Sequence, residues 1–223
     1  MTTHLTPKRE RWLLLTLASI QFTSVLDFMI MMPLGPQLTQ LFGISASQFG
    51  FLVSAYTFSA GLSGFLASTY IDRFGRKRMM LTLYPLFGVA AFACSLAPSF
   101  GWLMAARVAS GFFGGVLMAL SQTIVAEVVP FERRGRAMSL VMTSFSVATV
   151  AGVPLALFLV SHFNWHAPFL AIAAMVAVFA LGASQTLPSL KGHVQAHTEG
   201  NALRVIVANL RAVLSDPNHL RAF

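Results

Sequence analysis

Two charged residues stand inside long apolar stretches of the sequence, and their chemistry suits proton transfer. Asp27 is the only acidic residue within these stretches and Arg107 the only basic one. A buried carboxylate can bind and release a proton, and a nearby guanidinium favours its charged form. A charge at the centre of a bilayer costs about 2.5–3.5 kcal/mol on insertion scales, so both residues are candidate functional groups if these stretches cross a membrane.

The composition indicates an integral membrane protein. The 223 residues are 56% apolar and only 10% charged, whereas a soluble domain carries about 25% charged residues. A membrane span needs about 20 mainly apolar residues. No charged residue occurs between Asp27 and Asp72, between Arg78 and Arg107, or between Arg136 and Lys191. This pattern excludes a soluble enzyme and, despite the net charge of +8, a nucleic-acid binder.

Turn-forming and charged residues divide the apolar sequence into six expected spans. None alternates polar and apolar residues with period two, so helices are expected rather than barrel strands. The first span is expected to stop at the run Pro33-Leu34-Gly35-Pro36. The expected spans are 12–34, 49–70, 79–96, 102–125, 138–160 and 168–187.

The basic residues predict the orientation of these spans. Of the 15 Lys and Arg residues, all but Arg107 fall in the N-terminal segment, the second and fourth links, and the tail. The other three links contain none. Because basic loops stay on the cytoplasmic side, both chain ends are predicted to be cytoplasmic. The expected division is a cytoplasmic N-terminus 1–11, a six-helix bundle 12–187, and a tail 188–223.

The tail changes composition after Leu187. A polar stretch precedes apolar residues at helical spacing between Leu203 and Leu214, ending at Asp216-Pro217. This pattern predicts an amphipathic helix at the membrane surface, or alternatively a solvated linker helix. The chain then stops at Phe223 with no closing element, and is interpreted as truncated.

The two charges inside the spans are expected to lie at similar depth. Asp27 precedes the expected outer end of its span by about 10 Å, and Arg107 follows the start of its span by about 8 Å, at 1.5 Å per residue. We expect the two groups to meet in a water-accessible cavity. The alternative interpretation is a static ion pair that fixes helix register.

The second link carries the most specific motif, Asp72-Arg73-Phe74-Gly75-Arg76-Lys77-Arg78. Gly75 suits a turn position that needs positive φ, and Asp72 can pair with an arginine or cap a helix. Four basic residues would by themselves fix topology, but topology does not explain an acidic residue beside a glycine turn.

This motif resembles the signature that follows span two in the major facilitator superfamily, Gly-x-Leu-Ala-Asp-Arg-x-Gly-Arg-Lys. Asp72, Arg73, Gly75, Arg76 and Lys77 match it, while Ser68 and Tyr70 stand where Gly and Leu are usual. The resemblance implies an all-α membrane fold: six transmembrane helices, as two three-helix inverted repeats, forming the N-terminal half of a twelve-helix carrier. It also implies that 188–223 links the halves and begins a seventh span at Leu220.

Two further family features occur on spans four and five. Arg107 is followed four residues later by Gly111, although Ser110 replaces the usual Gln. Gly152-Val153-Pro154 resembles the Gly-Pro pair of efflux members, with Val153 inserted. Small residues let helices approach closely and proline permits bending. Gly111, Gly115, Gly152 and Pro154 are therefore expected at helix contacts, for which plain packing is a sufficient alternative.

By resemblance, Asp72, Arg76 and Glu127 form a cytoplasmic charge cluster that holds the outward-open state. The resemblance also implies a secondary transporter of the drug:proton antiporter or sugar-efflux type, working by alternating access. It would move drug-like, hydrophobic or sugar-like small molecules.

In that hypothesis Asp27 is the proton-coupling carboxylate, Arg107 modulates it, and Tyr56 and Gln122 line the cavity. The expected partners are the substrate, protons, lipid and a missing C-terminal half, in a bacterial inner membrane. No cofactor, metal site or enzyme activity is expected. The alternatives are a non-transporting or truncated membrane module, such as a scaffold or receptor, and an uncoupled facilitator.

Overall fold

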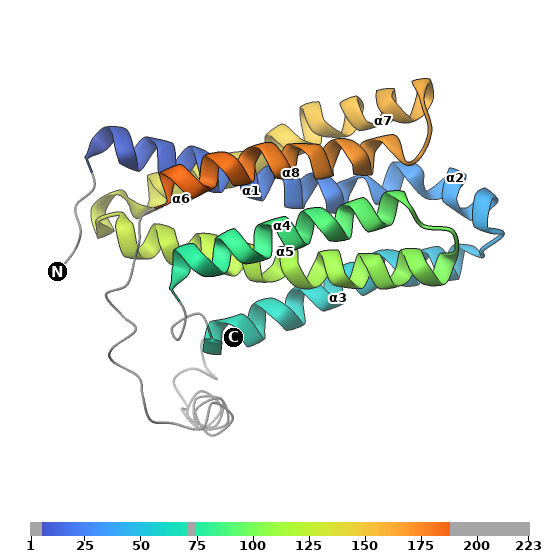
Figure 1. Ribbon diagram of the computed structural model, residues 1–223, viewed down its shortest axis with the longest axis horizontal. Coiled ribbons are helices and arrows are strands. Elements are labelled where there is room, and N and C mark those ends of the chain that lie inside the picture. The colour runs from blue at the N-terminus through green and yellow to red at the C-terminus, as the bar shows by residue number, and fades with distance from the viewer. Residues whose placement is uncertain (1–5, 71–74, 188–223) are drawn as a thin grey trace, which may run out of the picture.

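A computed structural model describes residues 6–70 and 75–187, and within these ranges the chain is helical with no strand. Six helices or helix pairs are long and apolar enough to cross a membrane. They run side by side along the long axis of the bundle (Figure 1). The predicted all-helical membrane fold with six spans is confirmed for these residues.

The helices follow the predicted spans closely. Span one is the pair α1 and α2, and span five is α6 and α7 joined by a π-helical turn, η2. The elements are α1 (Pro7–Met29), α2 (Met31–Phe42), α3 (Ala46–Tyr70), α4 (Arg76–Ser95), α5 (Phe100–Val128), α6 (Phe131–Val147), η2 (Ala148–Gly152), α7 (Val153–His162) and α8 (Ala167–Thr186).

The prediction that the first span stops at Pro33–Pro36 is wrong. The chain breaks its helix only at Ile30 and continues as α2 to Phe42, with Pro36 inside the helix. Pro33 lies in the first turn of α2, where a backbone N–H has no intrahelical partner in any case. Gly35 packs closely there: a Cβ at this position would lie 3.0 Å from the Phe49 ring, which would have to move by a few tenths of an ångström.

The packing of the helices repeats itself in two halves. In the first, α5 contacts α3 and α4; in the second, α1 contacts α6 and α8. Helix α4 also packs against α8, which joins the two sets. The first helix of each three-helix repeat thus packs on the other repeat: α5 packs on α3 and α4 of the repeat α1/α2–α3–α4, and α1 packs on α6 and α8 of the repeat α5–α6/α7–α8. This exchange fits the two repeats expected from the resemblance.

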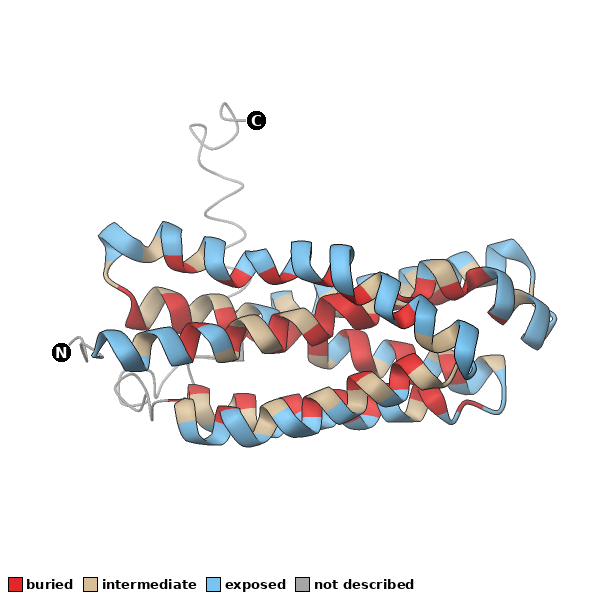
Figure 2. Ribbon diagram, turned by 90° about the horizontal axis from the view of Figure 1, so that it is seen from above, coloured by how far each residue is buried: buried red, intermediate tan, exposed pale blue. Residues whose placement is uncertain are grey.

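Buried and exposed side chains separate by helix face (Figure 2). Buried residues gather where helices face one another, and many exposed side chains are large and apolar, such as Phe58, Val150 and Leu181. Water would penalise so much exposed apolar surface, whereas lipid accepts it and the helices satisfy their own backbone. The surface therefore fits a membrane-embedded bundle.

The two ends of the bundle differ in charge. The start of α1, the end of α3, the starts of α4 and α6, and the end of α8 lie at one end, on the left in Figure 1. The loops after α2, α4 and α7 lie at the other end and contain no Lys or Arg. This separation of the basic residues agrees with the alternation of basic and non-basic links that the sequence predicts. The amphipathic segment and the proposed start of a seventh span lie outside the described residues.

Candidate functional site

Asp27 and Arg107 form an ion pair in the interior of the bundle. Arg107 Nη1 donates to Asp27 Oδ2 at 2.8 Å and to the Asp27 backbone carbonyl at 3.1 Å. The side chains come from α1 and α5 and both have 0% exposed surface. The two charges therefore lie at one level, as predicted, but they are closed off from solvent in this structure rather than open to a cavity.

Arg107 lies at the depth expected for it, whereas Asp27 lies deeper in its span than expected. Arg107 lies in the second turn of α5, as expected for a residue near one end of its span. Asp27 is followed by 15 further residues before the end of α2 at Phe42, because the prolines do not end the helix. The pair forms although the helices that carry it extend by different lengths beyond it.

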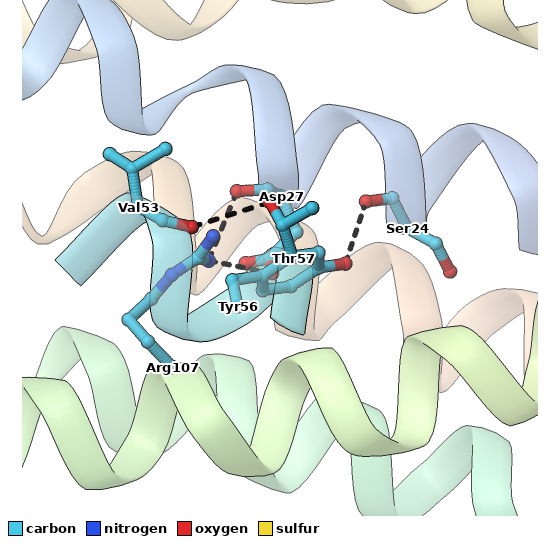
Figure 3. A network of polar contacts seen from close by, with 6 residues as sticks. All are labelled: Ser24, Asp27, Val53, Tyr56, Thr57 and Arg107. Carbon is cyan, nitrogen blue, oxygen red and sulfur yellow. Dashed lines mark hydrogen bonds and ion pairs between the residues drawn. The ribbon is translucent and has the colours of Figure 1, made fainter. Parts of the chain in front are cut away.

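A third helix completes the surroundings of the pair. The guanidinium carbon of Arg107 lies 4.3 Å from the centre of the Tyr56 ring, on α3. The Tyr56 hydroxyl donates to the Ser24 backbone carbonyl at 3.3 Å, and its ring lies 5.6 Å from that of Phe28. Figure 3 shows Asp27, Ser24, Tyr56 and Arg107 meeting in this way. A cation over an aromatic face is attracted by the ring quadrupole, by about 2 kcal/mol when desolvated.

Several polar atoms of this cluster have no hydrogen-bond partner. They are Asp27 Oδ1, Arg107 Nε, Arg107 Nη2 and Ser110 Oγ. A buried polar group left unpaired costs about 1–3 kcal/mol, so these atoms are available to bind water, a substrate or one another when the helices move.

The other predicted cavity residue, Gln122, does not join this cluster. It lies on α5, 15 residues beyond Arg107, which is about 22 Å along a helix. Its amide nitrogen contacts Met142 Sδ at 3.9 Å and it is partly exposed. The structure therefore separates Gln122 from the Asp27–Arg107 pair.

Sequence reasoning missed two neighbours of Arg107. Ser110 lies three residues from Arg107, one helical turn away, so helical spacing could have indicated it. Cys94 on α4 also lies close enough to interact electrostatically with Arg107. Nothing in the sequence signals that contact, because it depends on how α4 packs against α5.

A second ion pair lies near the basic end of the bundle. Arg76 at the start of α4 donates from Nε and Nη2 to Glu127 Oε1, at 3.0 and 2.6 Å. Glu127 is in the last turn of α5, so this pair holds the ends of α4 and α5 together. Asp72 and Arg73, the other predicted members of the gating motif, lie outside the described residues.

The rest of that motif includes one correction. Gly75 has φ −62° and caps the N-terminus of α4 in an extended conformation, so the prediction of a positive φ there is wrong. The turn continues directly into a helix, and an extended N-cap meets that need without a left-handed residue. Lys77 lies in the first turn of α4 and is partly exposed.

Close helix contacts occur at each glycine predicted for packing. A Cβ on Gly111 would lie 2.4 Å from the Tyr56 carbonyl oxygen, and one on Gly115 would lie 2.1 Å from the Ala60 carbonyl oxygen. A Cβ on Gly152 would lie 2.8 Å from Leu26. Pro154 lies in the first turn of α7, directly after the π-helical turn that interrupts span five. These glycines bring α3 onto α5, and span five onto α1.

This geometry defines a class of protein: a helical membrane bundle built from two three-helix units, with an ion pair buried between its first and fourth spans. The model of the Major Facilitator Superfamily matches residues 17–220. The chain belongs to this superfamily, whose members are transporters and not enzymes.

The chain matches only part of the length of each relative. The chain is 32% identical to an uncharacterised transporter of the superfamily, YtbD of Bacillus subtilis, over 73% of this chain and 41% of that protein. It is 29% identical to the niacin transporter NiaP of Acinetobacter baylyi, over 61% of this chain and 31% of that protein. It is also 29% identical to a gallate transporter of Pseudomonas putida, over 72% of this chain and 36% of that protein. The chain thus spans less than half the length of these relatives.

The fold is shared with a solved transporter. A bacterial homologue of the human lysosomal transporter Spinster, in an inward-facing and unoccupied conformation, superposes with a TM-score of 0.74 at 18% identity. The match covers 96% of this chain and 50% of that one. At this identity the likeness establishes the fold alone.

Proposed function

We propose that the chain is the N-terminal six-helix half of a secondary transporter that moves small molecules across the membrane by alternating access. The match to the Major Facilitator Superfamily and the half-length overlap with transporters support this proposal. In such carriers the substrate binds near the midplane between two halves. A second six-helix half, joined through residues 188–223, completes the carrier.

The proposal extends to proton coupling through Asp27. The observation that carries it is the Asp27–Arg107 pair, with both side chains fully buried. Breaking such a pair by protonating Asp27 leaves a buried guanidinium without its counter-ion, which is strongly unfavourable. Protonation of Asp27 is therefore linked to rearrangement of α1 against α5.

We further propose efflux of hydrophobic, drug-like or sugar-like molecules from bacterial cells. The Gly152-Val153-Pro154 sequence and the apolar, Met- and Phe-rich spans support this direction and class. The relatives named for niacin and gallate extend the candidate substrates to small organic acids. The protein would lie in the inner membrane with both ends cytoplasmic, as the basic residues at one end of the bundle indicate.

At the cytoplasmic end, Arg76 and Glu127 are proposed to stabilise one of the two alternating conformations. Their pair joins α4 to α5 where the bundle carries its basic residues. Separation of these charges on opening toward the cytoplasm would favour the other conformation.

A flux assay tests the proposal. The full-length carrier is assayed in everted membrane vesicles, with ethidium as a hydrophobic cationic probe and radiolabelled niacin as an acidic one. Accumulation that depends on the carrier and disappears when the proton gradient is collapsed supports coupled transport. Carrier-dependent flux that survives collapse of the gradient identifies a facilitator, and no carrier-dependent flux of either probe argues against the proposed substrate classes.

A further inference from the structure

Tyr56 lies beside the Arg107 guanidinium where this group meets Asp27. The Arg107 guanidinium carbon lies over the Tyr56 ring, 4.3 Å from the ring centre. Only Nη1 reaches the Asp27 carboxylate, while Nε and Nη2 on the other edge make no hydrogen bond to it. The guanidinium over the ring therefore meets the carboxylate with its end rather than with its side.

This end-on geometry is not the one that maximises hydrogen bonding. Arg76, another buried arginine, uses the Nε and Nη2 edge to hold the Glu127 carboxylate. At the internal pair, Asp27 Oδ1 and the Nε and Nη2 donors of Arg107 make no hydrogen bond to each other. The leftover groups are complementary, and a rotation of the guanidinium in its plane, or a shift of α1, would let them pair as a fork.

Tyr56 is itself held firmly by its neighbours. Its hydroxyl donates to the Ser24 carbonyl on α1. On α5, a Cβ at Gly111 would lie 2.4 Å from the Tyr56 carbonyl oxygen and one at Gly114 would lie 2.9 Å from its hydroxyl oxygen. The ring therefore touches both helices that carry the ion pair, while its own backbone belongs to α3.

We propose that Tyr56 is a positioning residue that holds Arg107 end-on to Asp27 and so sets how readily Asp27 takes up a proton. Through its contacts, Tyr56 links α3 to the ion pair. When α3 moves relative to α1 and α5, the ring moves with it and no longer holds the Arg107 guanidinium in place. The role in transport rests on the proposed proton coupling, whereas the effect on Asp27 does not.

Few other titratable groups surround Asp27 in the described part of the chain. Arg107 faces it from α5, Tyr56 from α3, and the thiol of Cys94 from α4 lies beside the same guanidinium. Arg107 is the one cation among them, so a change in how it meets Asp27 is the main electrostatic change available to this carboxyl group.

The test is an infrared titration of Asp27 in the full-length carrier, reconstituted in lipid. The protonated-carboxyl band that disappears in Asp27→Asn reports the protonation of this one residue, and no substrate is needed. Tyr56→Leu and Tyr56→Met both remove the ring, and each is expected to move the midpoint of this band to lower pH by about half to one unit, because a guanidinium freed from the ring can pair two donors with the carboxylate and stabilise its charged form more.

Two further variants serve as controls. Tyr56→Phe keeps the ring over Arg107 and is expected to leave the midpoint within about 0.3 unit of the wild-type value, a small fraction of the ring's contribution. Tyr84→Phe removes the hydroxyl of another buried tyrosine, which contacts Thr23 Oγ1 at 3.1 Å, one helical turn before Asp27, and does not contact the pair itself. It is expected to leave the midpoint unchanged.

An unchanged midpoint in Tyr56→Leu and Tyr56→Met would overturn the inference, as would an equal shift in Tyr84→Phe. The same holds if no band sensitive to Asp27→Asn titrates in any variant. These outcomes are distinguishable from a failure of the proposed function. If the Asp27→Asn carrier retains proton-driven flux, Asp27 has no coupling role, and this result does not depend on what the Tyr56 variants do to the infrared band.

Discussion

The contact between α3 and α5 gives a sharp prediction for Gly115. A Cβ at this position would lie 2.1 Å from the Ala60 carbonyl oxygen and 2.5 Å from Ser63 Oγ. Real Cβ atoms essentially never approach closer than 3.0 Å, so Gly115→Ala requires the two helices to separate by about 0.9 Å at this level. The obstacle is a backbone carbonyl, which cannot rotate away as a flexible side chain would.

Overpacking of this kind costs about 1–3 kcal/mol. Gly115→Ala is therefore expected to lower the midpoint of thermal unfolding of the full-length carrier, measured in detergent by intrinsic tryptophan fluorescence. The matched control is Gly61→Ala on α3, next to Ala60, where a Cβ meets no heavy atom within 4 Å. Because alanine favours a helix over glycine by up to about 1 kcal/mol, this control is expected to be neutral or stabilising.

Comparing the two variants separates the effect of helix packing on stability from the effect of replacing a glycine by an alanine. Both replace a helical glycine by alanine, and they differ only in the space around the new methyl group. A Gly115→Ala carrier that unfolds at or above the wild-type temperature would refute the packing of α3 on α5 described above. Equal destabilisation by the control would show that the effect has another cause.

Three further predictions use the same unfolding assay. Gly88→Ala places a Cβ 2.7 Å from Val176 Cγ1, so it should destabilise the carrier by about 1–3 kcal/mol and be rescued by Val176→Ala; no rescue would contradict the contact. Arg76→Lys loses the two-donor contact with Glu127, so it should cost about 1–3 kcal/mol, with Glu127→Gln having a similar effect and the double variant costing less than the sum. Arg133→Ala removes a pair whose arginine is 57% exposed, and a change above about 1 kcal/mol would be inconsistent with that exposure.

The helices could be predicted from the sequence because the membrane imposes a strong constraint. Apolar length and the alternation of basic links fix where the chain crosses and turns, and the six expected spans coincide with helices. The errors lie at Pro33–Pro36 and Gly75, where local signals for a turn were overridden. A chain within lipid gains more by continuing its backbone hydrogen bonds than it loses at one proline.

The pairing of Asp27 with Arg107 could also be predicted, since lone opposite charges in apolar spans have few other partners. The stacking of Tyr56 on Arg107 and the approach of Cys94 could not. Both depend on the rotation of α3 and α4 about their axes, which is set by contacts such as Gly111 against the Tyr56 backbone. Those contacts join residues far apart in the chain, and a single sequence does not encode them as a local pattern.

Proton-driven uptake by Asp27→Asn carriers in everted vesicles tests the central claim most directly. Asp27→Glu, which keeps a carboxylate in the same helix, serves as the matched variant, with equal amounts of protein in each preparation. If Asp27 couples transport to protons, Asp27→Asn loses accumulation driven by the pH gradient while Asp27→Glu retains part of it. Accumulation by Asp27→Asn equal to that of the wild type, and equally sensitive to collapse of the gradient, would contradict the account.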